Sequence, residues 1–269
     1  MKVLAARPRS PSLAAFVKSF HYQETNFPFA LERIIPNGQA HLMVNLGEDE
    51  FRTYGAARTL AIERHSGAVL AGPHAKSVVI DTGEQRWLVA VEFHSGGAGH
   101  FFPLPMSEVS NQVIELLDLW GHDGRSLRER LLDASTPALK FLVFEQVLRE
   151  HLAPRFDRAI GCAIGALRAG VPVRQIALRL GLLPRTFTRR FSSCVGITPK
   201  RFARVQRLQG VLRSVRRSAR LEWCALAAEH GYSDQAHLIH DFQDLADITP
   251  TGYKPHSPER NNHVPILAP

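Results

Sequence analysis

The sequence predicts an α+β protein, in which an N-terminal antiparallel β domain with flanking helices is followed by an all-helical C-terminal domain. Three observations lead to this prediction. Short apolar runs separated by turn signals fill residues 1–100, one helical pattern occurs twice between residues 176 and 253, and positive charge is concentrated in residues 155–220. The length of 269 residues is sufficient for two compact domains with cores of their own.

The β domain is predicted from the turns that interrupt its apolar runs. A turn signal at Pro36–Gly38 precedes an apolar run from Leu42 to Leu46, and Gly72-Pro73 separates two further runs. Runs of this length at short spacing are typical of an antiparallel sheet, a sandwich or a small barrel. The glycine-rich stretch 95–100 lacks the Lys-Ser/Thr of a P-loop and a full GxGxxG pattern, so we expect a plain loop there.

Two helices are predicted after Pro105. In the first, apolar residues from Val113 to Trp120 fall on one face until Gly121 ends the pattern. The second covers roughly residues 137–152 and has a wide apolar stripe from Phe141 to Leu152. This stripe faces either the N-terminal sheet or a second copy of the chain, and the sequence leaves both interpretations open.

The formal net charge of +8 is unevenly distributed along the chain. Residues 1–154 contain 15 basic and 17 acidic side chains, whereas residues 155–220 contain 16 basic side chains and one acidic side chain, Asp157. Residues 221–269 contain 2 basic and 7 acidic side chains. A basic block within an apolar-periodic segment favours a polyanionic partner such as nucleic acid over a merely solvated helix face.

Residues 176–202 and 226–253 are two copies of one pattern. The equivalent pairs are Gly181 and Gly231, Phe191 and Phe242, Ile197-Thr198-Pro199 and Ile248-Thr249-Pro250, and Phe202 and Tyr253. Each copy predicts a helix–turn–helix, because the glycine ends a first helix and a second helix then begins. That second helix begins at Pro184 in the first copy and is capped by Ser233 or Asp234 in the other.

The second helix of each copy is the element that would enter a major groove of DNA. Phe187 and Phe191 are spaced to face inward, which leaves a polar outer face. The outward positions are Arg185, Thr186, Thr188, Arg189 and Arg190 in the first copy, and Gln235, His237 and His240 in the second. An amphipathic helix at about 199–217 joins the copies, and its Lys200, Arg204 and Arg207 are expected to contact phosphates.

The paired Gly/Phe/Ile-Thr-Pro/aromatic spacing of residues 158–255 closely resembles the C-terminal DNA-binding domain of the AraC/XylS family of transcription regulators. Residues 5–152 resemble the cupin-like N-terminal sensory domain of one subgroup of that family. The run from Phe93-x3-Gly97-x3-Phe101 to Leu119-Trp120-Gly121 is the most specific part of this second resemblance. Together they imply a cytoplasmic regulator that binds double-stranded DNA and responds to a signal through its sensory domain.

The resemblance also implies a division of the chain and a set of base-reading positions. The sensory domain covers residues 1–152, the DNA-binding domain covers 155–255, and the tail 256–269 is expected to be flexible. Within the DNA-binding domain, the two helix–turn–helix units fall at about 171–195 and 222–246. The family's base-reading positions fall on Arg185, Thr188, Arg189, Gln235, Ala236, His237 and His240.

The sequence departs from the family pattern in two ways. Leu183 stands where the family usually has a serine cap, which would cost the helix about 1 kcal/mol. The second copy has Asp241 and Asp244 where the family tends to have basic residues, so this unit should gain little from phosphate neutralisation. We therefore expect the first copy and the joining helix to supply most of the affinity. The second copy would serve packing, weak readout or a contact with RNA polymerase.

The sequence shows no pattern of an enzyme or a metal site. The histidines form neither an HxH nor an HExxH motif, and the three cysteines are an odd number without a CxxC. We therefore expect no catalysis, cofactor or metal. For a small-molecule effector, the candidates by residue type in the sheet domain are Tyr22, Arg33, Met43, Asn45, Trp87 and Glu92.

Two other classes of function stay open at this stage. One is a ligand-binding or catalytic N-terminal module that the C-terminal half tethers to DNA, and the other is a protein-interaction regulator that uses the acidic second unit. RNA polymerase, an effector and a second copy of the chain are further candidate partners. No apolar run reaches the ~18 residues of a membrane span, no signal peptide is readable, and the cysteine usage fits a reducing cytoplasm.

Overall fold

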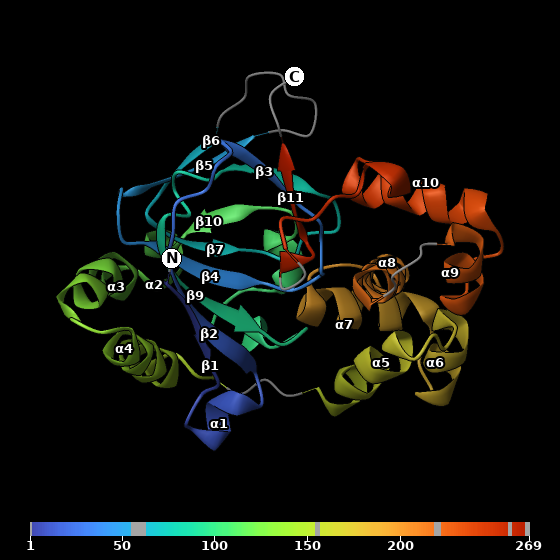
Figure 1. The fold of residues 1–269 in the computed structure, drawn as a ribbon. Coiled ribbons are helices and arrows are strands. Elements are labelled where there is room, and N and C mark those ends of the chain that lie inside the picture. The colour runs from blue at the N-terminus through green and yellow to red at the C-terminus, as the bar shows by residue number, and fades with distance from the viewer. Residues whose placement is uncertain (1, 55–62, 154–156, 218–221, 258–259, 267–269) are drawn as a thin grey trace.

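The computed structural model describes residues 2–54, 63–153, 157–217, 222–257 and 260–266. It consists of a sheet domain with helices on one flank and a group of helices beside it (Figure 1). The predicted α+β fold with antiparallel sheets followed by a helical domain is confirmed. Within the described residues, no helix is long and apolar enough to cross a membrane.

The sheet domain contains two sheets in which every pairing is antiparallel. In order, the first sheet consists of β1 (Lys2–Ala6), β2 (Val17–Glu24), β9 (Trp87–Phe93), β4 (His41–Asn45), β7 (Ala68–Ala71) and β10 (Val113–Glu115). The second consists of β11 (His263–Ile266), β3 (Leu31–Ile34), β8 (Val78–Asp81), β5 (Glu50–Tyr54) and β6 (Glu63–Ser66). Phe51, Val69 and Leu88 form a small apolar core that brings side chains of both sheets together.

The helices divide between the two domains. The sheet domain carries α1 (Pro11–Ala14), α2 (Leu116–Trp120), α3 (His122–Asp133) and α4 (Pro137–Glu150). The helical domain consists of α5 (Arg158–Arg168), α6 (Val173–Arg179), α7 (Pro184–Val195), α8 (Pro199–Arg217), α9 (Trp223–Glu229) and α10 (Gln235–Ala246). Short 3₁₀ turns lie at Ala98–His100, Met106–Val109 and Pro250–Gly252.

The first predicted helix after Pro105 is shorter than expected. Val113–Glu115 forms strand β10 instead, because these residues pair with Val69–Ala71 of β7, and the helix begins only at Leu116. The apolar stripe of α4 packs against its own sheet, where Phe144 is fully buried and stacks on Phe20 with ring centroids 6.0 Å apart. Burial against the sheet therefore accounts for the centre of this stripe.

The C-terminal tail, which we expected to be flexible, adds a strand to the sheet domain. His263–Ile266 pairs with β3, and Figure 1 shows this strand, β11, beside β3. The Glu32 side chain, which is fully buried, anchors the strand: its Oε2 lies 2.8 Å from His263 Nδ1 and 3.6 Å from Arg260 Nη2. Tertiary contacts thus order a segment that has no helix or strand signal of its own.

The helical domain packs directly on the sheet domain. Arg33 of β3 forms an ion pair of 2.7 Å with Asp247 after α10, and the amide of Ser77 donates to the carbonyl of Leu245. The guanidinium of Arg201 on α8 donates to the carbonyl of Ala75 at 3.2 Å. The turn between β7 and β8 and its surroundings therefore hold α8 and the end of α10.

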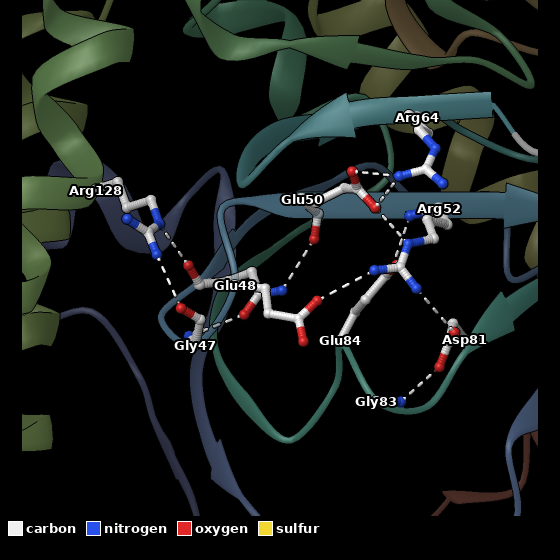
Figure 2. Close-up of polar contacts among 10 residues, drawn as sticks. Gly47, Glu48, Glu50, Arg52, Arg64, Asp81, Gly83, Glu84 and Arg128 are labelled. Atoms are coloured by element: carbon white, nitrogen blue, oxygen red, sulfur yellow. Dashed lines mark hydrogen bonds and ion pairs between the residues drawn. The ribbon is translucent and has the colours of Figure 1, made fainter.

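A polar cluster ties β5 to the turn before β9 (Figure 2). Arg52 lies at its centre, with ion-pair distances of 3.1 Å to Glu48, 3.5 Å to Asp81 and 3.3 Å to Glu84, and it also hydrogen bonds Glu50. The amide of Arg52 donates to Glu84 Oε2 at 2.7 Å. Burial raises the pKa of Glu84 to about 7, although the hydrogen bond from the Arg52 amide opposes this shift.

We expect Glu84 to make the stability of the protein depend on pH. Its pKa is higher in the folded chain than in the unfolded chain, so folding favours the protonated carboxyl. This stabilisation is fully present below about pH 4.5 and is lost as the pH rises through about 7, with a size on the order of 3 kcal/mol. Urea unfolding of Glu84→Gln at pH 5 and pH 8 should show a smaller difference than the native sequence does. An unchanged difference would contradict this assignment.

Candidate nucleic-acid interface

The first helix–turn–helix unit is formed by α6 and α7. Gly181, with a φ of 64°, ends α6, and the amide of Leu182 then donates to the carbonyl of Ala177 at 3.0 Å. The helix α7 begins at Pro184 without a side-chain cap from Leu183. Its inner face is fixed by Phe187, which is fully buried in the domain core, so the opposite face of α7 points outward.

The outer face of α7 presents two cations. Arg185 and Arg189 are exposed, and within the described part of the chain neither is in an ion pair or a side-chain hydrogen bond. Thr186 and Thr188 are half-buried beside them. This arrangement leaves two guanidinium groups on one helix available to an external partner.

Arg190 differs from its neighbours because it has a partner within the domain. Its Nη2 and Nε lie 2.7 Å and 3.1 Å from Asp157 Oδ2. The other carboxylate oxygen of Asp157 caps α5 by accepting from the amides of Ala159 and Ile160. Arg190 therefore fastens α7 to α5, and the structure does not support its expected role at the DNA.

The arginines of α8 that we expected at phosphates face α10 instead. Arg204 Nη2 lies 2.6 Å from Asp241 Oδ1 and 2.7 Å from Asp244 Oδ2. Arg207 Nη2 lies 3.1 Å from Asp241 Oδ2, and its guanidinium stacks 4.3 Å from the ring centroid of Tyr232. Because internal carboxylates pair with both guanidinium groups, the expectation that they neutralise phosphates is revised. Lys200 remains exposed on the first turn of α8.

The same contacts change the interpretation of the acidic second unit. The carboxylate of Asp241 is 1% exposed and belongs to the interface between α8 and α10. Asp244 forms an ion pair of 2.8 Å with Arg201 as well as its contact with Arg204. The negative charge of α10 is thus directed at α8, where it pairs with arginines of the same domain.

The outward residues of α10 are mainly neutral. Gln235, Ala236 and His240 are exposed, whereas His237 is half-buried and packs edge-on against Tyr232 with ring centroids 5.1 Å apart. The carboxylate of Asp234 caps the helix by accepting from the amide of His237 at 2.7 Å. His237 is therefore partly occupied inside the unit, and Gln235, His240 and Gln243 are exposed polar side chains that α10 offers to an external partner.

The pairing of α8 with α10 is the feature that sequence reasoning missed. Arg201, Arg204 and Arg207 recur every three residues, and Asp241 and Asp244 have the same spacing. Residues three apart lie on one face of a helix, so the sequence already shows a positively charged face on α8 and a negatively charged face on α10. Because the charge was summed separately over residues 155–220 and 221–269, the two faces were not recognised as partners of opposite charge.

The six effector candidates of the sheet domain do not come together. Tyr22 and Trp87 belong to the core that packs against α4, with Trp87 Nε1 donating to the Tyr22 hydroxyl at 3.1 Å, whereas Met43 packs against the small core that joins the two sheets. Arg33 contacts Asp247 on the far side of the second sheet. Asn45 Nδ2 donates to the carbonyl of Glu50, and Glu92 forms an ion pair of 2.8 Å with Lys18. None of the six lines the cavity of the described chain that lies between the domains.

The described residues offer no site for a metal ion. Within the residues that the structure describes, no three or more His, Cys, Asp or Glu side chains are arranged to bind a metal ion. Cys162, Cys194 and Cys224 are free thiols. The candidate site of this chain is therefore the outer surface of α7 and α10.

Comparison with known protein families gives two matches. Residues 6–115 match a family described as a domain of unknown function (DUF6597), and residues 176–255 match a family described as a helix-turn-helix domain. Comparison with curated proteins finds no match.

Several solved structures of ToxT from Vibrio cholerae are similar to the chain. An apo point variant has a TM-score of 0.41 at 10% sequence identity, over 93% of this chain and 95% of that chain. A 1.65 Å structure has a TM-score of 0.40 at 9% identity, over 94% and 96% of the two chains. A structure of ToxT with a bound unsaturated fatty acid has a TM-score of 0.37 at 11% identity, over 93% and 92%. The family match at residues 176–255 covers the two units built by α6–α7 and α9–α10, and this part of the chain is a helix–turn–helix domain.

Proposed function

We propose that the protein is a sequence-specific DNA-binding transcription regulator that reads its site mainly with α7. The observation that supports this proposal is the pair of exposed arginines, Arg185 and Arg189, on the outer face of α7. The inner face of this helix is buried in the core of the domain. A helix presented in this way fits the major groove, and an arginine can donate two hydrogen bonds to the edge of a guanine.

The proposal assigns different roles to the other basic residues. Lys200 is exposed at the start of α8 and is suited to a phosphate contact, whereas Arg190, Arg204 and Arg207 hold the domain together. Thr186 and Thr188 would contact DNA beside the arginines of α7. Gln235 and His240 of α10 would add weaker base recognition at a second segment of the major groove. Such a regulator would act on chromosomal DNA in the cytoplasm.

The sheet domain would serve as the sensory part, and a second copy of the chain would be a partner. Leu139 and Leu142 of α4 are 45% and 39% exposed and offer an apolar surface for such a contact. The alternative of a protein-interaction regulator would use the acidic second unit, in which Glu229 and Asp234 are exposed, whereas Asp241 is buried against α8. A contact of this unit with RNA polymerase would use the same exposed surface.

Arg189→Ala should weaken binding to a selected DNA site much more than binding to a scrambled duplex. A bidentate arginine–guanine contact contributes about 1–3 kcal/mol of discrimination, which corresponds to a loss of roughly 5- to 150-fold. The site would first be selected from random duplexes with the intact protein, and both affinities would then be measured by fluorescence anisotropy.

Arg125→Ala is the matched control, because it removes the same charge from an exposed position on α3. It should change neither the preference nor the affinity by more than a small factor. An equal loss on both duplexes in Arg189→Ala would show that Arg189 contacts phosphate. Failure of the intact protein to select any sequence would overturn the proposed function.

A further inference from the structure

Leu183 is a large apolar side chain that the fold leaves in water. It lies directly before α7 and is 75% exposed, whereas the neighbouring Leu182 packs against the core of the helical domain. The carbonyl of Leu183 accepts the first hydrogen bond of α7, from the amide of Phe187 at 2.9 Å, so Leu183 is the N-cap residue. Its side chain makes no cap hydrogen bond. The backbone of Leu183 therefore starts the helix, and its side chain is available to an external partner.

A leucine at this position gives the helix no local benefit. Serine, threonine, asparagine and aspartate stabilise a helix at the N-cap, because their side-chain oxygens accept from free amides of the first turn, and leucine cannot do so. The first turn of α7 contains no acidic residue that would compensate. Within the described chain, Leu183 also belongs to none of the apolar cores. A residue that breaks a local rule without such compensation marks a functional position.

The surroundings of Leu183 favour a negatively charged partner. Arg185 and Arg189 are exposed on the same helix, and the free amides at the N-terminus of α7 carry partial positive charge. A two-fold contact between copies of the chain at Leu183 would bring the arginines of both copies together, which disfavours a homodimer at this surface. DNA combines negative charge with one apolar feature in its major groove, the C5-methyl group of thymine.

The position of Leu183 in the helix–turn–helix unit agrees with a contact to a base. In this motif the N-terminal residues of the second helix contact base edges in the major groove, and Leu183 lies at the N-terminus of α7. Leu183 and Arg185 are two residues apart, or about 3 Å along a helix, which is close to the base-pair rise of roughly 3.4 Å. A base that Leu183 contacts is therefore expected next to the base that Arg185 contacts.

We propose that Leu183 is a specificity-determining residue that contacts the C5-methyl group of a thymine in the DNA site. This inference rests on the proposed function, and it adds a thymine to the guanines that Arg185 and Arg189 would select. The contact removes a leucine side chain and a methyl group from water together, and it needs no hydrogen bond. Of the four bases, thymine alone carries this methyl group.

Replacement of thymine by deoxyuridine tests the contact, because it removes only the C5-methyl group. The site selected from random duplexes would be prepared with each thymine replaced in turn, and affinities would be measured by fluorescence anisotropy. For the native sequence, at least one replacement should weaken binding by about 3- to 10-fold, as the loss of one buried methyl group and its contacts predicts. At that position, Leu183→Ala should bind the thymine and deoxyuridine duplexes equally, because its side chain is too short to reach the methyl group.

Two further variants separate this contact from an effect on folding. Leu178→Ala is the matched control, because Leu178 is 79% exposed but belongs to α6. Both Leu178→Ala and Leu183→Met, which retains a large apolar side chain, should keep the preference for thymine. Alanine caps a helix no better than leucine does, so Leu183→Ala should unfold at the same temperature as the native sequence in circular dichroism.

Failure of this contact and failure of the proposed function give different results. A preference for thymine that persists at every position in Leu183→Ala, or that Leu178→Ala abolishes as well, would overturn the role of Leu183. Sequence-specific binding by the native chain that no deoxyuridine replacement weakens would also overturn it and would leave the proposed function intact. Failure of the native chain to select any sequence would overturn the proposed function itself.

Discussion

Asp241→Ala should lower the free energy of unfolding of the helical domain by about 1.5–3 kcal/mol, because it removes charge-assisted hydrogen bonds from two arginines to one buried carboxylate. The Asp241 carboxylate is 1% exposed and accepts from Arg204 Nε at 2.9 Å, from Arg204 Nη2 at 2.6 Å and from Arg207 Nη2 at 3.1 Å. Without it, Arg204 keeps only Asp244, and Arg207 keeps no carboxylate among the described residues.

Urea unfolding followed by circular dichroism measures this loss. Asp118→Ala on α2 is the control, because it removes the same charge from an exposed position and should change stability by less than about 0.5 kcal/mol. Equal effects of the two substitutions would contradict a structural role for Asp241. By the same reasoning, Arg204→Ala is expected to lower the stability of the helical domain rather than to remove a phosphate contact.

Glu32→Ala should release the C-terminal strand β11 from the sheet domain. The side chain of Glu32 is fully buried, and its Oε2 lies beside both His263 and Arg260 of the tail. Loss of this buried anchor at a cost of about 3 kcal/mol would lower the protection of the amides of β11 from hydrogen exchange by roughly 100-fold, apart from Pro265, which has no amide hydrogen.

Hydrogen exchange with mass spectrometry detects this change in β11 and in its partner β3. Glu63→Ala on β6 is the control, because its side chain is 74% exposed and lies in the same sheet. The control should leave the protection of β11 as it is. Unchanged protection in Glu32→Ala would mean that the backbone pairing with β3 alone holds the tail.

Local signals explain why the helix–turn–helix units were predictable from the sequence. The glycine after α6, Pro184 and the inward Phe187 and Phe191 act within a few residues of one another, and the structure shows these features as predicted. The stripes on α8 and α10 were also present in the sequence, but recognising them as partners requires knowing that the two helices pack together.

Other parts of the fold depended on contacts that the sequence does not encode locally. The strand β11 is four residues long and contains Pro265, which argues against a strand by local rules, and it forms because β3 offers an edge. For the effector candidates, residue type identified suitable side chains, but neighbouring positions of a strand alternate between the two faces of a sheet. Tyr22 and Met43 therefore belong to different cores.

The pairing of β11 with β3 gives the helical domain two tethers to the sheet domain. The chain leaves the sheet domain after α4 to form α5–α10 and then returns to it through β11, as Figure 1 shows. A domain with one covalent connection to its neighbour can rotate about any axis. A domain with two connections can rotate as a rigid body only about the axis that passes through both. Any rearrangement that retains β11 should therefore be a rotation about the axis through these two connections, in which α7 and α10 move together.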